Sequence, residues 1–399
     1  MKILYLSSAI PEEEYMHFAN SSSFEISPAA YKFNKLLIKG LSRIPGVEVD
    51  CMVSNTINKK LQKYRVFDGV IKSEDDVDFY YLKDDKASGV GMVKNYISFI
   101  KEWTNKNKDK DCAIVCDVLN VSASLSAIVI SKMLKIPTVG IVTDLPEFVG
   151  PYYNLEKKPF KEKLRIKINM DIIRKFSSFV FLTEQMNDKV NHSNKPYCVI
   201  EGFCDINMES VKNELEDKHQ EKVCIYSGSL HREYGIEMLI KAFVKSNLQN
   251  AELHIYGDGN YRKEIENICK SATNIKFKGF KPNSTVVKEQ LKASALINPR
   301  PSHEEYTKYS FPSKTLEYMV SGTATITTKL PGMPKEYYEY VYLIEEESVE
   351  GIEKALCEVL NKSEKELHNK GMAAKEFVLK EKNNISQGNK IVEMIKKIK

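Results

Sequence analysis

The chain repeats one plan in each of its halves: a continuously apolar segment, then small residues, then an amphipathic segment. Residues 2–8 (KILYLSS) open the first half in this way, and residues 222–228 (KVCIYSG) open the second. Amphipathic helices are expected after them, at 27–41 and 235–246. Apolar segments without polar alternation are typical of strands buried on both faces, which occur in parallel sheets covered by helices. The pattern therefore predicts an α/β chain with two doubly wound, Rossmann-like domains.

Further strands, alternating with helical segments, are expected on both sides of a polar stretch at 207–220. They lie at 47–53, 112–116, 138–143, 178–182 and 197–200 in the first half, and at 252–256, 274–277, 293–298, 324–327 and 341–344 in the second. A charge-rich stretch between two such sets is typical of a linker or an exposed helix. We therefore expect an N-terminal domain over residues 1–205 and a C-terminal domain over 206–377. The basic helix expected at about 378–399 has no strand left to cover and is free to pack back on the first domain.

Composition narrows the class of function. A chain of 399 residues exceeds what one core usually holds, and a net charge of +5 is too small to indicate a nucleic-acid partner. The eight cysteines form no CxxC pair and the seven histidines are dispersed, which favours free thiols in a reducing compartment and no metal site. The first apolar segment is short and stops at Pro11, unlike a signal peptide. We therefore expect a cytoplasmic protein without a metal cofactor.

The segment 309–322 (YSFPSKTLEYMVSG) carries the strongest chemical signal. Pro312 suits the first turn of a helix and Gly322 the position just after its end. Lys314 and Glu317 are three residues apart and share one face of that helix. A cation and a carboxylate beside helix N–H groups suit a ligand with both phosphate and hydroxyl groups, such as a nucleotide sugar. By spacing alone, a solvated surface pair is the commoner explanation.

Other candidate residues follow the expected strands. Gly228 and Ser229 form a strand-to-helix turn whose N–H groups can approach a phosphate, and Arg232 lies in the same loop. Gly257 lets the chain turn sharply beneath a ligand. Arg300 stands between two prolines, and arginine suits bidentate phosphate binding. For each residue the alternative is an ordinary tight turn or a solvated charge.

One carboxylate in the first half also follows directly after an expected strand. Asp144 ends the apolar strand 138–143, and parallel sheets bind ligands at the carboxyl ends of their strands. Asp144 is our first choice for an acid or base that faces the acceptor. The alternative is an aspartate that only forms a turn or caps a helix.

A second segment, 159–175, interleaves basic and apolar residues. A basic amphipathic helix can lie on an anionic membrane surface, although many such helices only cover a sheet. The residues expected to face the inner membrane surface are Lys161, Lys163, Arg165 and Lys167.

Three motifs together resemble glycosyltransferase family 4, which has the GT-B fold: residues 225–230 (IYSGSL), 252–259 (ELHIYGDG) and 311–322. The resemblance covers the second half and is only general in the first. It implies two Rossmann-like domains that face each other across a cleft, with the acceptor bound by the first and a nucleotide diphosphate-sugar by the second. It further implies sugar transfer to a glycan or lipid-linked acceptor with retained anomeric configuration, in cell-surface polysaccharide or glycoconjugate biosynthesis. The nucleotide sugar is then a substrate, and no cofactor or metal is required.

The resemblance also assigns roles to individual residues. The family places two glutamates around the donor; the second, on the ribose hydroxyls, matches Glu317, and Tyr309 stands in place of the first. Ser229 and Tyr234 stand where the family usually has a diphosphate-binding arginine and lysine, so the phosphate contact is expected from Lys314, helped by Arg300 or Arg232. The expected catalytic residues are Lys314 and Asp144, and the donor-binding residues are Gly228, Ser229, Arg232, Gly257, Arg300, Tyr309, Ser313, Lys314 and Glu317.

Two other functions remain open on the sequence. A sugar-nucleotide epimerase of the same fold would need no acceptor. A non-catalytic partner of another transferase would bind the nucleotide sugar without turnover.

Overall fold

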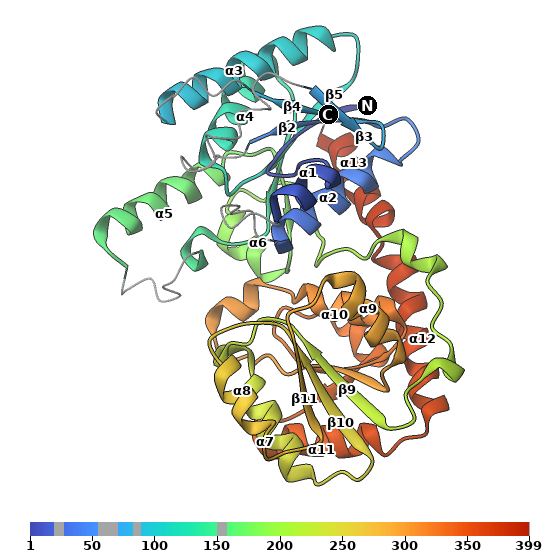
Figure 1. Cartoon of the computed structure of the whole chain (residues 1–399). Coiled ribbons are helices and arrows are strands. Elements are labelled where there is room, and N and C mark those ends of the chain that lie inside the picture. The colour runs from blue at the N-terminus through green and yellow to red at the C-terminus, as the bar shows by residue number, and fades with distance from the viewer. Residues whose placement is uncertain (20–27, 55–70, 83–88, 150–157, 399) are drawn as a thin grey trace. The chain divides into compact units, whose positions relative to one another are not determined.

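A computed structural model describes residues 1–19, 28–54, 71–82, 89–149 and 158–398, which form two compact units (Figure 1). Unit 1 comprises Met1–Phe203 together with Asn384–Lys399, and unit 2 comprises Cys204–Asn383. All eight cysteines lie in the described ranges and are free thiols, as their spacing predicted.

Unit 1 is built on an eight-stranded sheet. Its strands are β1 (Lys2–Ser7), β2 (Glu48–Val53), β3 (Ile71–Glu74), β4 (Val77–Tyr81), β5 (Cys112–Asp117), β6 (Thr138–Val142), β7 (Ser178–Phe181) and β8 (Tyr197–Val199). They lie in the order β3-β4-β2-β1-β5-β6-β7-β8, and all neighbours are parallel except β3 and β4. In register, Ile3 of β1 lies between Val49 and Ala113. The strand order reverses at β1, as in a doubly wound fold.

The strands β3 and β4 were not predicted from the sequence. They form the edge of the sheet, where β3 is almost fully exposed and β4 alternates buried and half-exposed residues. A search for continuously apolar segments finds strands covered on both faces and therefore misses these two.

The helices of unit 1 cover this sheet. They are α1 (Glu12–Ala19), α2 (Pro28–Ser42), α3 (Gly89–Lys106), α4 (Val121–Leu134), α5 (Phe160–Ile173), α6 (Gln185–Val190) and α13 (Asn384–Ile398), with a 3-10 turn η2 (Pro146–Phe148) after β6. The helix expected at 27–41 is α2, and residue 27 lies outside the described residues.

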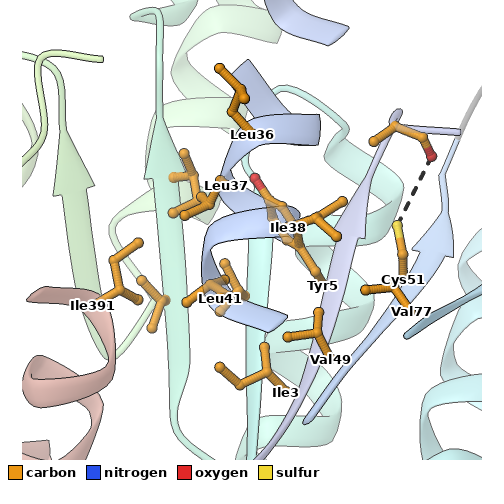
Figure 2. Packing of buried hydrophobic residues seen from close by; sticks show 14 of the residues in the cluster. Ile3, Tyr5, Leu36, Leu37, Ile38, Leu41, Val49, Cys51, Val77 and Ile391 are labelled. Carbon is orange, nitrogen blue, oxygen red and sulfur yellow. Dashed lines mark hydrogen bonds between the residues drawn. The ribbon is translucent and has the colours of Figure 1, made fainter. Parts of the chain in front are cut away.

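The terminal helix α13 packs against α2. Its Ile391 joins the buried cluster that contains Ile3 and Leu41 (Figure 2). A Cβ atom on Gly40 would lie 2.1 Å from the Asn384 carbonyl oxygen, so the two helices approach where α2 has no side chain. The basic segment expected as one helix at about 378–399 is divided: α12 (Glu364–Glu381) belongs to unit 2, and the chain enters unit 1 at Asn384.

Unit 2 has a six-stranded, fully parallel sheet. Its strands are β9 (Lys222–Ser227), β10 (Ala251–Tyr256), β11 (Ile275–Gly279), β12 (Ala295–Asn298), β13 (Ala324–Thr328) and β14 (Tyr342–Ile344), in the order β11-β10-β9-β12-β13-β14. The helices are α7 (Ile236–Ser246), α8 (Arg262–Ile268), α9 (Asn283–Lys292), α10 (Ser313–Ser321), α11 (Val349–Leu360) and α12. Short 3-10 turns connect them: η4 (Ile206–Ser210), η5 (Leu215–Asp217), η6 (Arg232–Tyr234), η7 (Glu305–Tyr309) and η8 (Lys335–Tyr340).

The polar stretch 207–220 between the two sets of strands holds the turns η4 and η5. The strand order of unit 2 reverses between β9 and β12. In open parallel sheets, ligands bind at the carboxyl ends of the strands at such a reversal. The expected α/β architecture of two parallel-sheet, Rossmann-like domains is confirmed.

Candidate functional site

The loops after β9 and β10 interlock through their backbones. The Gly228 N–H donates to the Tyr256 carbonyl at 2.9 Å, and the Leu230 N–H donates to the Asp258 carbonyl at 2.9 Å. Gly257 has φ +138°, and a Cβ atom there would lie 1.8 Å from the Gly228 carbonyl oxygen. Only glycine fits at this close approach. The two loops therefore form one continuous surface at the carboxyl edge of the sheet.

Lys314 extends over this surface. It is the second residue of α10 and is half-buried. A Cβ atom on Gly228 would lie 2.6 Å from its Cε and 3.3 Å from its Nζ, so the ammonium group lies directly against the β9 turn. The amino end of a helix carries partial positive charge, to which the ammonium adds. Ser313, the first residue of α10, is exposed beside it.

A buried polar network supports the other side of α10. Tyr318 is fully buried, and its hydroxyl accepts the Ser227 N–H at 2.9 Å and lies 3.1 Å from the Ser227 Oγ. Gln290 of α9, also fully buried, donates from Nε2 to Ser227 Oγ at 3.2 Å and to Glu317 Oε1 at 3.3 Å. Burial raises the pKa of the Tyr318 hydroxyl, so it stays a neutral hydrogen-bonding group. This network ties α10 to the end of β9 and orients the half-buried Glu317.

Arg300 follows β12 and is held by aromatic rings. The carbon at the centre of its guanidinium lies 4.9 Å from the ring centroid of Tyr306 and 5.7 Å from that of Tyr234. Its Nε is buried without a hydrogen-bond partner, and no carboxylate among the described residues pairs with it. Gly235 allows this packing, since a Cβ atom there would lie 2.1 Å from the Pro299 carbonyl oxygen. Arg300 is thus a positioned cation with hydrogen-bonding capacity for an anion.

The remaining donor-site candidates lie around this arrangement. Arg232 is exposed and already faces acids, with Nε 3.4 Å from Glu237 and Nη2 4.0 Å from Glu264. Ser229 is exposed, and its carbonyl accepts the Tyr226 hydroxyl at 2.8 Å. Tyr309 is buried at the end of η7. Gly228, Gly257, Lys314 and Glu317 meet at the ends of β9 and β10 and on α10, whereas Arg232 is directed to neighbouring acids.

Unit 1 has two carboxylates at the carboxyl edge of its own sheet. Asp144 is exposed just after β6. Asp117 ends β5 and is buried; its Oδ1 accepts the Leu119 N–H and its Oδ2 accepts the Asn34 Nδ2, each at 3.1 Å. Burial raises the pKa of Asp117, and the nearby charge of Asp144 acts in the same direction. Asp117 was not singled out from the sequence, where nothing distinguished it from any polar residue that ends a strand.

Comparisons with known proteins agree with this architecture. Residues 207–377 match the family described as Glycosyl transferases group 1. The structure resembles sucrose-phosphate synthase from Thermosynechococcus elongatus, with a TM-score of 0.68 and 13% identity over 100% of this chain and 99% of that one. The chain has the GT-B fold.

Two further structures support the same fold. A glycosyltransferase from Rickettsia africae has a TM-score of 0.67 and 14% identity over 100% of this chain and 98% of its own. Anabaena HepE in complex with UDP has a TM-score of 0.62 and 14% identity over 100% of both chains. No curated protein matches the chain.

Proposed function

We propose that the protein is a glycosyltransferase whose nucleotide diphosphate-sugar donor binds at the carboxyl edge of the unit 2 sheet. The observation that carries this proposal is the Lys314 ammonium, which lies over the Gly228 turn at the start of α10. Arg300 supplies a second cation at the strand-order reversal. The match to Glycosyl transferases group 1 covers this unit, and HepE has been solved with UDP and with UDP-glucose.

The chemistry follows from these charges. As the anomeric bond breaks, the leaving diphosphate gains negative charge, which a positioned ammonium and a helix amino end stabilise. Glu317 would hold the ribose hydroxyls. In a retaining mechanism of glycosyltransferase family 4, the acceptor hydroxyl attacks from the face that the diphosphate leaves, and a departing phosphate oxygen takes its proton. Asp144 would orient the acceptor hydroxyl or assist its deprotonation. Lys314 and Arg300 take the role that a metal ion has in other transferases.

We further propose that the acceptor is a glycan or a lipid-linked glycan at the inner face of the membrane, in the biosynthesis of a cell-surface polymer. The support is the exposure of Lys161, Lys163, Arg165 and Lys167 on α5. Among the described helices, none has both the length and the apolarity needed to cross a bilayer. Association at the surface through these cations is the form of membrane contact that we propose.

Product analysis separates this function from its alternatives. With UDP-glucose and a lipid-linked glycan fraction, a transferase releases UDP faster than with the donor alone and forms a new glycosidic bond. NMR of the product is expected to show the anomeric configuration of the donor. Conversion of the donor into an isomeric sugar nucleotide without an acceptor would favour an epimerase. Donor binding without turnover would identify a non-catalytic partner. The same assay with guanosine and adenosine diphosphate-sugars covers the other bases.

A further inference from the structure

Helix α5 has apolar residues on two of its faces. Ile166, Met170 and Ile173 are buried against unit 1. On another face, the side chains of Phe160, Leu164 and Ile168 are 80%, 48% and 48% exposed. Residues four apart lie one turn apart on the same side of a helix. These three side chains therefore form an exposed apolar stripe along α5.

Basic residues flank the stripe on both sides. At about 100° per residue, Lys161 and Arg165 fall on one side of it, and Lys163 and Lys167 fall on the other. All four are exposed, and Arg165 pairs with Glu162 at 2.5 Å. A helix that lies in a membrane interface has this arrangement, with apolar side chains directed into the lipid and long basic side chains reaching back to the headgroups.

Two of these cations, Lys163 and Lys167, also line a pocket beside the helix. That pocket lies between α5, η2 and α6, where Lys189 Nζ is 3.4 Å from Glu147 and Arg174 Nη1 is 3.6 Å from Asp171. Residues 160–168 contain four basic residues and one acid, Glu162, so this part of α5 carries an excess of positive charge that is complementary to an anionic surface.

We infer that the stripe of Phe160, Leu164 and Ile168 inserts into the acyl layer of an anionic lipid bilayer, with the flanking lysines and arginine at the level of the lipid phosphates. This inference rests on the proposed association with the membrane and deepens it. Contact is made by burial of three apolar side chains as well as by charge. It brings unit 1, to which we assign the acceptor, to the surface where a lipid-linked acceptor is held.

Sedimentation with vesicles tests the inference on the full-length protein. One set of vesicles contains phosphatidylcholine alone, and the other also contains anionic phosphatidylglycerol. The variant Phe160→Ser/Leu164→Ser/Ile168→Ser is expected to partition into the anionic vesicles at least about tenfold less than wild type, because it loses three buried apolar groups. The variant Lys161→Glu/Lys163→Glu/Lys167→Glu should also be released. The control Val244→Ser, which removes a 52% exposed apolar side chain from α7, should bind like wild type.

Fluorescence tests the insertion itself. The chain has one tryptophan, Trp103, which is buried in unit 1. In the variant Leu164→Trp, anionic vesicles are expected to shift the emission to shorter wavelength, and in Val244→Trp they should not. Wild-type binding by the triple serine variant, or no shift in Leu164→Trp, would overturn the inference. Retained vesicle binding with loss of a protein partner would assign the stripe to that partner and would equally overturn it.

The donor site provides an independent control. It lies in unit 2, so titration with UDP reports on the proposed function and not on the lipid contact. Variants that lose vesicle binding but keep wild-type affinity for UDP are folded and affected only on α5. A failure of UDP binding in wild type would contradict the proposed function. The vesicle measurement would still support or overturn the lipid contact of α5.

Discussion

Replacing Lys314 with alanine is expected to lower kcat/KM for sugar transfer about a hundredfold or more, with the fold intact. The reason is the position of the ammonium, which lies over the Gly228 turn where the leaving diphosphate is proposed to gain charge. Loss of one preorganised group at such a place removes stabilisation of the transition state that water cannot restore. Since Lys314 is half-buried in the first turn of α10, its truncation leaves the buried face of the helix in place.

Steady-state kinetics on matched variants checks this prediction. Lys314→Arg keeps the charge and should retain part of the activity. Lys354→Ala removes an exposed lysine from α11 and should behave like wild type. Circular dichroism confirms that each variant is folded. If Lys314→Ala kept the wild-type kcat/KM, the diphosphate contact would have to come from elsewhere, and Arg300 would be the next residue to replace.

The second large effect is expected on stability. Gly257→Ala should lose about 3 kcal/mol or more of the free energy of unfolding. Its φ of +138° is unfavourable for alanine, and its Cβ atom would lie 1.8 Å from the Gly228 carbonyl oxygen. Relief of that overlap requires the two loops after β9 and β10 to separate. Equilibrium unfolding in urea measures the loss.

A second glycine provides the matched comparison. A Cβ atom on Gly228 meets only side-chain atoms, the nearest being Lys314 Cε at 2.6 Å. Gly228→Ala should therefore displace Lys314 and lower activity while changing stability much less than Gly257→Ala. Gly89→Ala in α3, where nothing lies within 4 Å, is the control for the substitution itself. Wild-type stability of Gly257→Ala would show that the loops do not interlock as described.

Much of the fold could be predicted because most of its strands are short and continuously apolar. The segments expected at 138–143 and 324–327, for example, are β6 and β13 within one residue at each end. Burial on both faces removes polar alternation, which leaves a clear signal in the sequence. The edge strands β3 and β4 lack it, since one of their faces remains in contact with water.

The site was predictable only where backbone geometry demands particular residues. Gly228, Lys314 and Glu317 were predicted as donor-site residues from turn and helix signals, and the structure brings Gly228 and Lys314 into contact. Gln290 has no such signal. A glutamine on a helix is usually exposed, and the burial of this one depends on β9 and α10, which pack against it. The contact of Arg300 with Tyr306 likewise depends on how the loop after β12 folds back, which no local pattern determines.

Thermal unfolding of the full-length protein with nucleotide ligands tests the donor site most directly. A ligand that binds only the native state at a hundredfold excess over its Kd adds about 2.7 kcal/mol of stability. We predict that one nucleoside diphosphate from a panel of uridine, guanosine and adenosine forms, together with its sugar nucleotides, raises the Tm more than the corresponding monophosphate does. That difference should disappear in Lys314→Ala. If no diphosphate or sugar nucleotide in the panel raised the Tm of wild type, the carboxyl edge of the unit 2 sheet would not be a donor site.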